Sequence, residues 1–134
     1  MMAASDFVFS HVFHEFPNIK CTLSEGGGGW VPYLMERADN CFDRYKWEDG
    51  RYLEIPPSEL FKKNIYVCVI DDRVAIELRH HIGVDKMLWE SDYPHADSTW
   101  PHSLKAIEEM FVGVPEDELR KITELNARRL LNFY

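Results

Sequence analysis

The chain has 134 residues, of which 46% are hydrophobic and 13% aromatic, so it can bury the core of one domain and is too apolar to be disordered. Its formal net charge of -8 comes from 23 acidic and 15 basic residues, and the resulting field repels nucleic acid and anionic lipid surfaces. The sequence has no apolar run of bilayer length and no signal-peptide pattern at its start. Its three cysteines lack C-x-x-C spacing, so we expect a cytoplasmic protein with reduced thiols and without a membrane or nucleic-acid partner.

The first half of the chain predicts a helix, a strand and a second helix. Apolar residues recur at helical spacing over Ala3–Phe16, and a proline follows. The apolar-leaning run Ile19–Ser24 predicts a short strand that ends at Glu25 and a run of glycines. Helical spacing resumes over about Pro32–Trp47, and the polar segment Glu48–Ser58 predicts a long loop.

The second half predicts two more strands. The segment Ile65–Ile70 is apolar on both sets of alternating positions, as in a parallel strand buried on both faces. A third strand is expected at Met87–Ser91, followed by a loop over Tyr93–Ser103. Gly83 is a plausible cap for the helix before that third strand. The helices expected in this half cover Val74–His81, about Leu104–Phe111, and a last segment that opens with Val114-Pro-Glu-Asp-Glu.

Carboxylates follow all three predicted strands. Strands that alternate with helices imply a parallel sheet, in which functional groups gather at the carboxyl ends of the strands. Glu25 follows the first strand, Asp71 and Asp72 the second, and Asp92 the third. For Asp71 and Asp72 we favour capping of the next helix. Asp92 differs because a loop with histidine and aromatic residues separates it from the next helix, and such a carboxylate can hold a cation and take a proton from its bound water.

Three motifs resemble a known family. The segment Ser91–His102, which reads SDYPHADSTWPH, resembles the loop after the last barrel strand of the amidohydrolase-related family. Phe16-Pro17-Asn18 before the first strand and Asn126-Ala-Arg-Arg-Leu130 in the last helix resemble two further family elements. The resemblance covers nearly the whole chain. It implies an α/β fold that is the C-terminal part of a (β/α)8 TIM-like barrel, with about three parallel strands and flanking helices in a single partial domain over residues 1–134.

The resemblance also implies a metal-dependent hydrolase. Members of this family hydrolyse small carboxylate, amide or ester-type substrates, or decarboxylate them without oxidation. They hold a divalent metal, which we expect to be zinc with manganese as the second choice, through a His-x-His pair after the first barrel strand and an Asp after the last. Asp92 matches that Asp, whereas the sequence contains no His-x-His. We therefore expect Asp92 to be a metal ligand and proton-transfer group.

Four further residues are candidates for the site. Glu25 stands where many family members have a histidine, and it can act as an acidic ligand or general base, or simply cap the amides that follow it. His95 can bind substrate or orient Asp92, or it can pack within its loop. Trp30 and Trp100 can wall a substrate pocket, although plain packing explains them as well.

We expect structural roles for the other histidines and for the glycine run. His11, His14, His80 and His81 are expected to be ordinary helix residues, because a metal-binding histidine faces other ligands and an outer partner. The glycines at Gly26–Gly29 lack the spacing of a phosphate-binding loop, so we expect a close approach of their backbone to another segment.

Two alternatives to a working enzyme stay open. The chain can be a non-catalytic truncated fragment, or a partner-dependent module without a complete metal site and without bound metal. Three strands cut from a barrel leave two unpaired edges, so we expect self-association or a missing N-terminal barrel half. A small flavodoxin-like binding domain is a third possibility, because it has the same order of elements.

Overall fold

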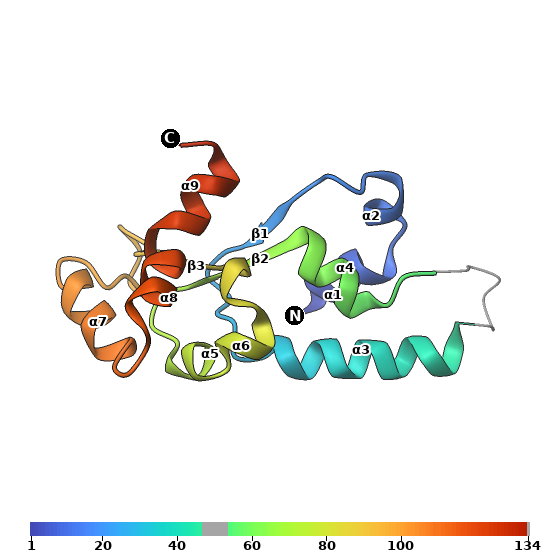
Figure 1. Ribbon diagram of the computed structural model, residues 1–134, viewed down its shortest axis with the longest axis horizontal. Helices are drawn as coiled ribbons and strands as arrows, with labels where there is room; N and C mark the ends of the chain where they lie inside the picture. The colour runs from blue at the N-terminus through green and yellow to red at the C-terminus, as the bar shows by residue number, and fades with distance from the viewer. Residues whose placement is uncertain (47–53, 134) are drawn as a thin grey trace.

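The fold is built on three parallel strands. We describe residues 1–46 and 54–133 of a computed structural model (Figure 1). The strands are β1 (Cys21–Leu23), β2 (Ile65–Val69) and β3 (Met87–Trp89), and β2 lies between the other two. Leu23 lies opposite Val67, and Val69 lies opposite Trp89. The α/β fold with three parallel strands is therefore confirmed.

Helices precede, connect and follow the strands. Among the described residues, no helix has both the length and the apolar character needed to cross a membrane. The helical elements are α1 (Met2–Phe9), α2 (Val12–Glu15), α3 (Val31–Tyr45), α4 (Pro57–Asn64), α5 (Arg73–Glu77), α6 (Arg79–Ile82), the 3-10 turn η1 (Val84–Lys86), α7 (Ser103–Met110), α8 (Glu116–Arg120), the π-helical segment η2 (Lys121–Leu125) and α9 (Asn126–Leu131).

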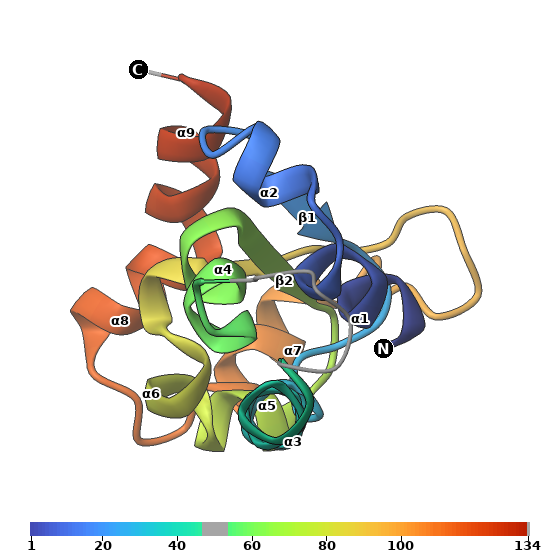
Figure 2. The same ribbon diagram turned by 90° about the vertical axis from the view of Figure 1, so that its right-hand side faces the viewer.

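Strand β2 is buried on both faces, as its uniformly apolar sequence predicts. Ile65, Val67 and Val69 belong to the main core, which also includes buried side chains of α3. Tyr66 and Cys68 face the other way and form a second cluster with Leu88, Ala127 and Leu130. Figures 1 and 2 show the corresponding arrangement, with α3 and α9 on opposite sides of the strands.

Asn126 explains the motif near the end of the chain. Its side chain is 1% exposed and its Nδ2 donates to the carbonyl oxygens of Val84 and Met87, at 2.8 and 2.9 Å. Met87 begins β3, so this amide satisfies a buried carbonyl beside the sheet. Ala127 and Leu130 of the same motif then cover the second cluster. The motif therefore fastens the last helical run to β3.

The N-terminal helix differs from the prediction. We expected one helix over Ala3–Phe16, but α1 ends at Phe9 and α2 begins at Val12, so a continuous helix is wrong. Ser10 separates the two helices. Its hydroxyl donates to the Phe7 carbonyl at 2.9 Å and accepts from the Val12 amide at 3.3 Å. These local bonds replace those of a continuing helix.

Helix α4 was not predicted. The expected loop Glu48–Ser58 lies partly outside the described residues, and its last two residues already belong to α4. Pro57 occupies the first turn, a position that suits proline. At the other end Asn64, which is 0% exposed, donates to the carbonyls of Pro17 and Ile19 at 3.2 and 2.8 Å. This amide ties α4 to the segment that leads into β1.

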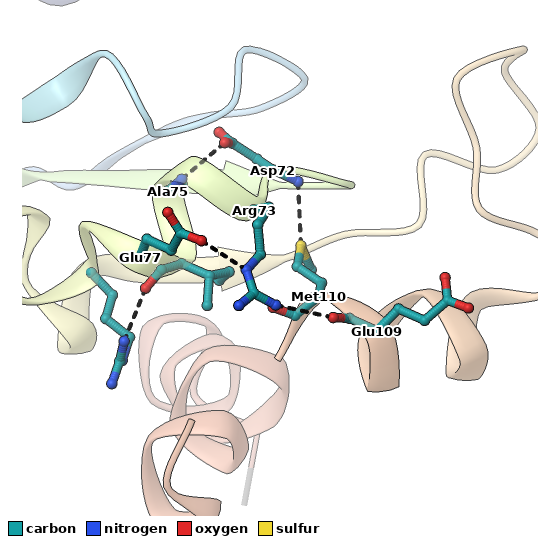
Figure 3. A network of polar contacts seen from close by, with 8 residues as sticks. Asp72, Arg73, Ala75, Glu77, Glu109 and Met110 are labelled. Carbon is teal, nitrogen blue, oxygen red and sulfur yellow. Dashed lines mark hydrogen bonds and ion pairs between the residues drawn. The ribbon is translucent and has the colours of Figure 1, made fainter. Parts of the chain in front are cut away.

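Asp72 joins the glycine run to the start of α5. Its Oδ1 accepts the amide of Ala75 at 2.9 Å, which caps the helix (Figure 3). Its Oδ2 accepts the amides of Gly28 and Gly29 at 2.7 and 3.1 Å. The capping role is confirmed for Asp72, whereas Asp71 is exposed and does not form this cap.

The glycines allow this close approach, as expected. Gly27 has φ of 63°, and a Cβ atom there would lie 2.6 Å from Oδ2 of Asp72. A Cβ atom on Gly28 would meet the side chain of Ala75 at 3.2 Å. Larger residues would therefore push the turn away from the carboxylate that holds it.

The same region anchors α7. Figure 3 shows Arg73 of α5 reaching the end of α7, where its Nη1 donates to the carbonyls of Glu109 and Met110 at 3.2 and 3.3 Å. The amide of Asp72 donates to Sδ of Met110 at 3.2 Å. These contacts fix the far end of the segment that starts at Asp92, so they limit where the intervening loop can lie.

We predict that Asp72→Ala lowers the free energy of unfolding by about 1–3 kcal/mol, because three backbone amides lose their acceptor. Urea denaturation followed by circular dichroism measures the change. Asp71→Ala is the matched control, since it removes the neighbouring, exposed carboxylate and should leave stability nearly unchanged. Equal losses in the two variants would contradict the assigned role of Asp72.

Candidate functional site

Side chains from the ends of β1 and β3 converge. Glu25, Asp92 and His95 each place a potential ligand atom within 4.8 Å of the others. Nδ1 of His95 lies 2.8 Å from Oδ1 of Asp92 and 3.9 Å from Oε1 of Glu25. Within residues 1–46 and 54–133, these three form the one group of this kind. We call them the acidic cluster.

The backbone holds both carboxylates of the acidic cluster in unusual positions. Asp92 has φ of 56° and Glu25 has φ of 62°, in the left-handed region that costs an L-residue about 1 kcal/mol or more. The side chain of Asp92 is 8% exposed, so it faces its neighbours instead of bulk solvent. The amide of His95 donates to the carbonyl of Asp92 at 2.8 Å and closes this turn. Such strain is typical of functional sites.

His95 lies between the two carboxylates and responds to both. Its pKa is raised above the usual value, first by the hydrogen bond to Asp92, then by the charge of Asp92, and then by that of Glu25. The imidazole itself is exposed to solvent. The cluster thus combines two oxygen donors with one nitrogen donor that can exchange a proton.

The acids after β2 lie elsewhere. Asp72 is occupied by the backbone amides of the glycine run and of α5. Asp71 lines a separate open hollow of about 620 Å³ together with Asp97, His102 and Glu109. The acids that follow the first and third strands therefore lie close together, whereas those that follow the second strand do not join them.

The two tryptophans have different surroundings. The indole N–H of Trp30 donates to the carbonyl of Gly26 at 2.9 Å, and its ring meets Phe61 edge-on with centroids 6.4 Å apart. Trp100 is exposed and lies edge-on to Tyr93, at 5.6 Å between centroids. Trp30 therefore packs against the main core, whereas Trp100 stands on the loop that carries Asp92 and His95.

The histidines outside the acidic cluster do not belong to a ligand group within the described ranges. His11 and His14 belong to the α2 region, and His80 lies 3.5 Å from Glu118. That these histidines are ordinary helix residues stays a prediction.

Glu90 is a neighbour of the site that sequence reasoning missed. Its Oε1 accepts the amide of Glu25 at 2.6 Å. Its own amide donates to the carbonyl of Val69 at 3.0 Å, which extends the pairing of β3 with β2. The available signal was an acidic residue directly after the apolar strand MLW, two positions before Asp92.

The thiol of Cys68 is a neighbour of Glu90 and Ser24. Burial raises the pKa of its thiol to about 11, and the charge of Glu90 and a hydrogen bond to it act in the same direction, against an opposing hydrogen bond from Ser24. Ser24 Oγ lies 3.6 Å from the sulfur. The thiol is therefore neutral at physiological pH.

Comparison with known proteins gives the family. The family model described as Amidohydrolase matches residues 1–133. The chain belongs to the amidohydrolase family. The comparison with curated proteins gives no match.

Solved structures share the fold. A 5-carboxyvanillate decarboxylase from Sphingomonas paucimobilis is 22% identical with a TM-score of 0.83, over 99% of this chain and 39% of that one. An amidohydrolase from Mycobacterium avium subsp. paratuberculosis is 28% identical with a TM-score of 0.79, over 96% and 32%. A dihydroxybenzoic acid decarboxylase from Polaromonas with bound manganese and the inhibitor 2-nitroresorcinol is 22% identical with a TM-score of 0.76, over 98% and 39%.

The chain spans about two fifths or less of the length of those structures. Nearly all of it is covered by the match, so its three parallel strands and their helices correspond to part of a TIM-like barrel. The predicted fold class and family are thereby confirmed.

We predict that Cys68 reacts slowly with iodoacetamide. With a pKa of about 11, roughly one thiol in a thousand is ionised at pH 8, and the thiolate is the reactive form. Exposed Cys41 is the internal control and should be alkylated first. Peptide mass spectrometry over time measures both rates, and urea should abolish the difference. Equal rates in the folded chain would contradict the burial of the thiol.

Proposed function

We propose that the protein containing this chain is a metal-dependent enzyme of the amidohydrolase family. It hydrolyses a small carboxylate, amide or ester-type substrate, or decarboxylates it without oxidation. The observation that carries the proposal is the convergence of Asp92, Glu25 and His95 at the carboxyl ends of two strands. In barrels of this type, catalytic groups come from that end of the sheet.

The acidic cluster fits a divalent cation. Two carboxylate oxygens and one imidazole nitrogen suit zinc, and they also suit manganese. Manganese is bound in the Polaromonas decarboxylase, which supports it as the second choice. In our proposal Asp92 is a metal ligand and Glu25 is a further oxygen donor of this chain, while His95 keeps its hydrogen bond to Asp92. A bound cation would polarise a substrate oxygen and lower the pKa of a water molecule.

The side chains also suggest how protons move. Asp92 and His95 are 2.8 Å apart, so a proton accepted by the carboxylate can be shared with Nδ1 of the imidazole. The exposed carboxylate of Glu25 lies 3.9 Å from the same nitrogen and can serve as a second base. We assign proton transfer to Asp92, with Glu25 in support.

The surrounding loop supports a small-molecule substrate. His95 is the exposed imidazole of the acidic cluster, and Trp100 offers an exposed aromatic surface on the same loop. Both are proposed as substrate contacts. The contacts of Trp30 with Gly26 and Phe61 favour packing, so it is the weakest of the proposed contacts. Decarboxylases among the solved structures support including decarboxylation beside hydrolysis.

Metal binding tests the proposal. We expect the purified chain to bind Mn²⁺ or Zn²⁺ in stoichiometric amounts, and Asp92→Ala to weaken binding by at least about tenfold. Electron paramagnetic resonance measures free Mn²⁺, and zinc is measured by competition. Asp97→Ala is the matched control, because it removes an exposed carboxylate from the same loop and should leave affinity unchanged.

Failure of this test has a defined meaning. If the chain binds neither ion, or if Asp92→Ala and Asp97→Ala behave alike, the second candidate gains support. That candidate is a non-catalytic fragment or a module that needs a partner for a complete metal site. The partial coverage of the solved structures favours it.

We further predict that the isolated chain self-associates. In the part of the chain that the structure describes, β1 and β3 each have one edge without a strand partner. A closed barrel has no such edges, and open edges pair readily with other chains. Sedimentation velocity over a range of concentrations should show species larger than 15.8 kDa. A monodisperse monomer at every concentration would contradict this.

A further inference from the structure

We propose that Glu90 is a positioning residue that holds Glu25 in the acidic cluster. The inference rests on the proposed function, because it treats Glu25, Asp92 and His95 as the site. It adds a residue that does not itself belong to the group of potential ligands. Glu90 would act on the site through the backbone of Glu25.

The contact is short and charged. Oε1 of Glu90 accepts the amide of Glu25 at 2.6 Å, and a hydrogen bond to an ionised acceptor is about twice as strong as a neutral one. Glu25 adopts a left-handed backbone that an L-residue does not prefer. The bond offsets this cost and fixes the direction in which the Glu25 side chain leaves the turn.

Glu90 is itself held firmly. Its amide bonds to the carbonyl of Val69, so the backbone of Glu90 is set by the pairing of β3 with β2. The side chain then reaches the turn after β1, passing the end of the strand between them. Cys68 of that middle strand remains a neutral thiol, so it adds no negative charge below the carboxylate. The pairing of β3 with β2 therefore fixes the backbone from which the Glu90 side chain extends.

The other end of the turn has its own support. Asp72 accepts the amides of Gly28 and Gly29, so carboxylates that follow β2 and β3 hold the turn on both sides of Gly26 and Gly27. Asp72 also caps α5 and therefore contributes to folding. Glu90 contacts the turn at Glu25, the residue whose side chain belongs to the cluster.

Variants of Glu90 separate positioning from general stability. Glu90→Gln keeps an oxygen that can accept the Glu25 amide, whereas Glu90→Leu has similar size and no acceptor. Glu90→Asp keeps the charge but is one methylene shorter, so it should not reach. Glu36→Gln, on the exposed side of α3, controls for the loss of one negative charge.

Mn²⁺ affinity is the first readout. We expect Glu90→Leu and Glu90→Asp to weaken binding about tenfold, Glu90→Gln to weaken it less than about threefold, and Glu36→Gln to leave it unchanged. Adding Glu90→Leu to Glu25→Gln should cause no further loss, because both changes act through one side chain. Wild-type affinity in Glu90→Asp, or a full additional loss in the double variant, would overturn the proposal.

The second readout needs no metal. In the wild-type chain the amide proton of Glu25 should resonate downfield in nuclear magnetic resonance spectra, as a short charged hydrogen bond requires. It should move upfield in Glu90→Asp and Glu90→Leu, and less in Glu90→Gln. If these shifts occur while the wild type binds no Mn²⁺, the metal function fails and the contact stands. If metal binds but the amide does not respond, the role of Glu90 is overturned and the function stands.

Discussion

The turn between β1 and α3 is held by carboxylates from the segments that follow the two other strands. Asp72 accepts amides of Gly28 and Gly29, and Glu90 accepts the amide of Glu25. Backbone amides in such a turn need acceptors once they leave water, and charged acceptors meet that need best. The start of α5 shares Asp72 with the turn, and the end of α7 rests on the same segment. The path of the chain around the site therefore depends on these hydrogen bonds.

Local patterns were enough to predict much of this fold. The apolar run of β2 predicted that this strand is buried on both faces. Asp72 was expected to cap a helix because Asp is favoured at that position. The division of the N-terminal helix was missed because it depends on the hydroxyl of Ser10, which bonds to its own neighbours. Helix α4 was missed because its eight residues begin inside a proline-containing polar stretch. Short elements of this kind are stabilised by tertiary packing more than by local preference.

The candidate site could be predicted from sequence where a single strand end carried the signal. Asp92 followed from its motif, and Glu25 from its place after an apolar run. The sequence could not show that the Asp72 carboxylate binds the glycine amides instead of joining the acidic cluster. That contact depends on the position of a turn that is distant in the sequence. Glu90 was missed for a related reason: its role depends on reaching a turn 65 positions away in the sequence. Pairing of strands decides such contacts, and a single strand does not reveal them.

A partial barrel can still hold part of a site. Glu25 and Asp92 follow the strands on either side of β2, so the pairing of these three strands brings both residues to one edge of the sheet. On the face opposite α3, the second cluster is covered by Ala127 and Leu130, so the middle strand stays buried without other strands. The acidic cluster is therefore a property of this segment. In our proposal, further ligands from the rest of a barrel would complete a metal centre whose first donors this chain already holds in place.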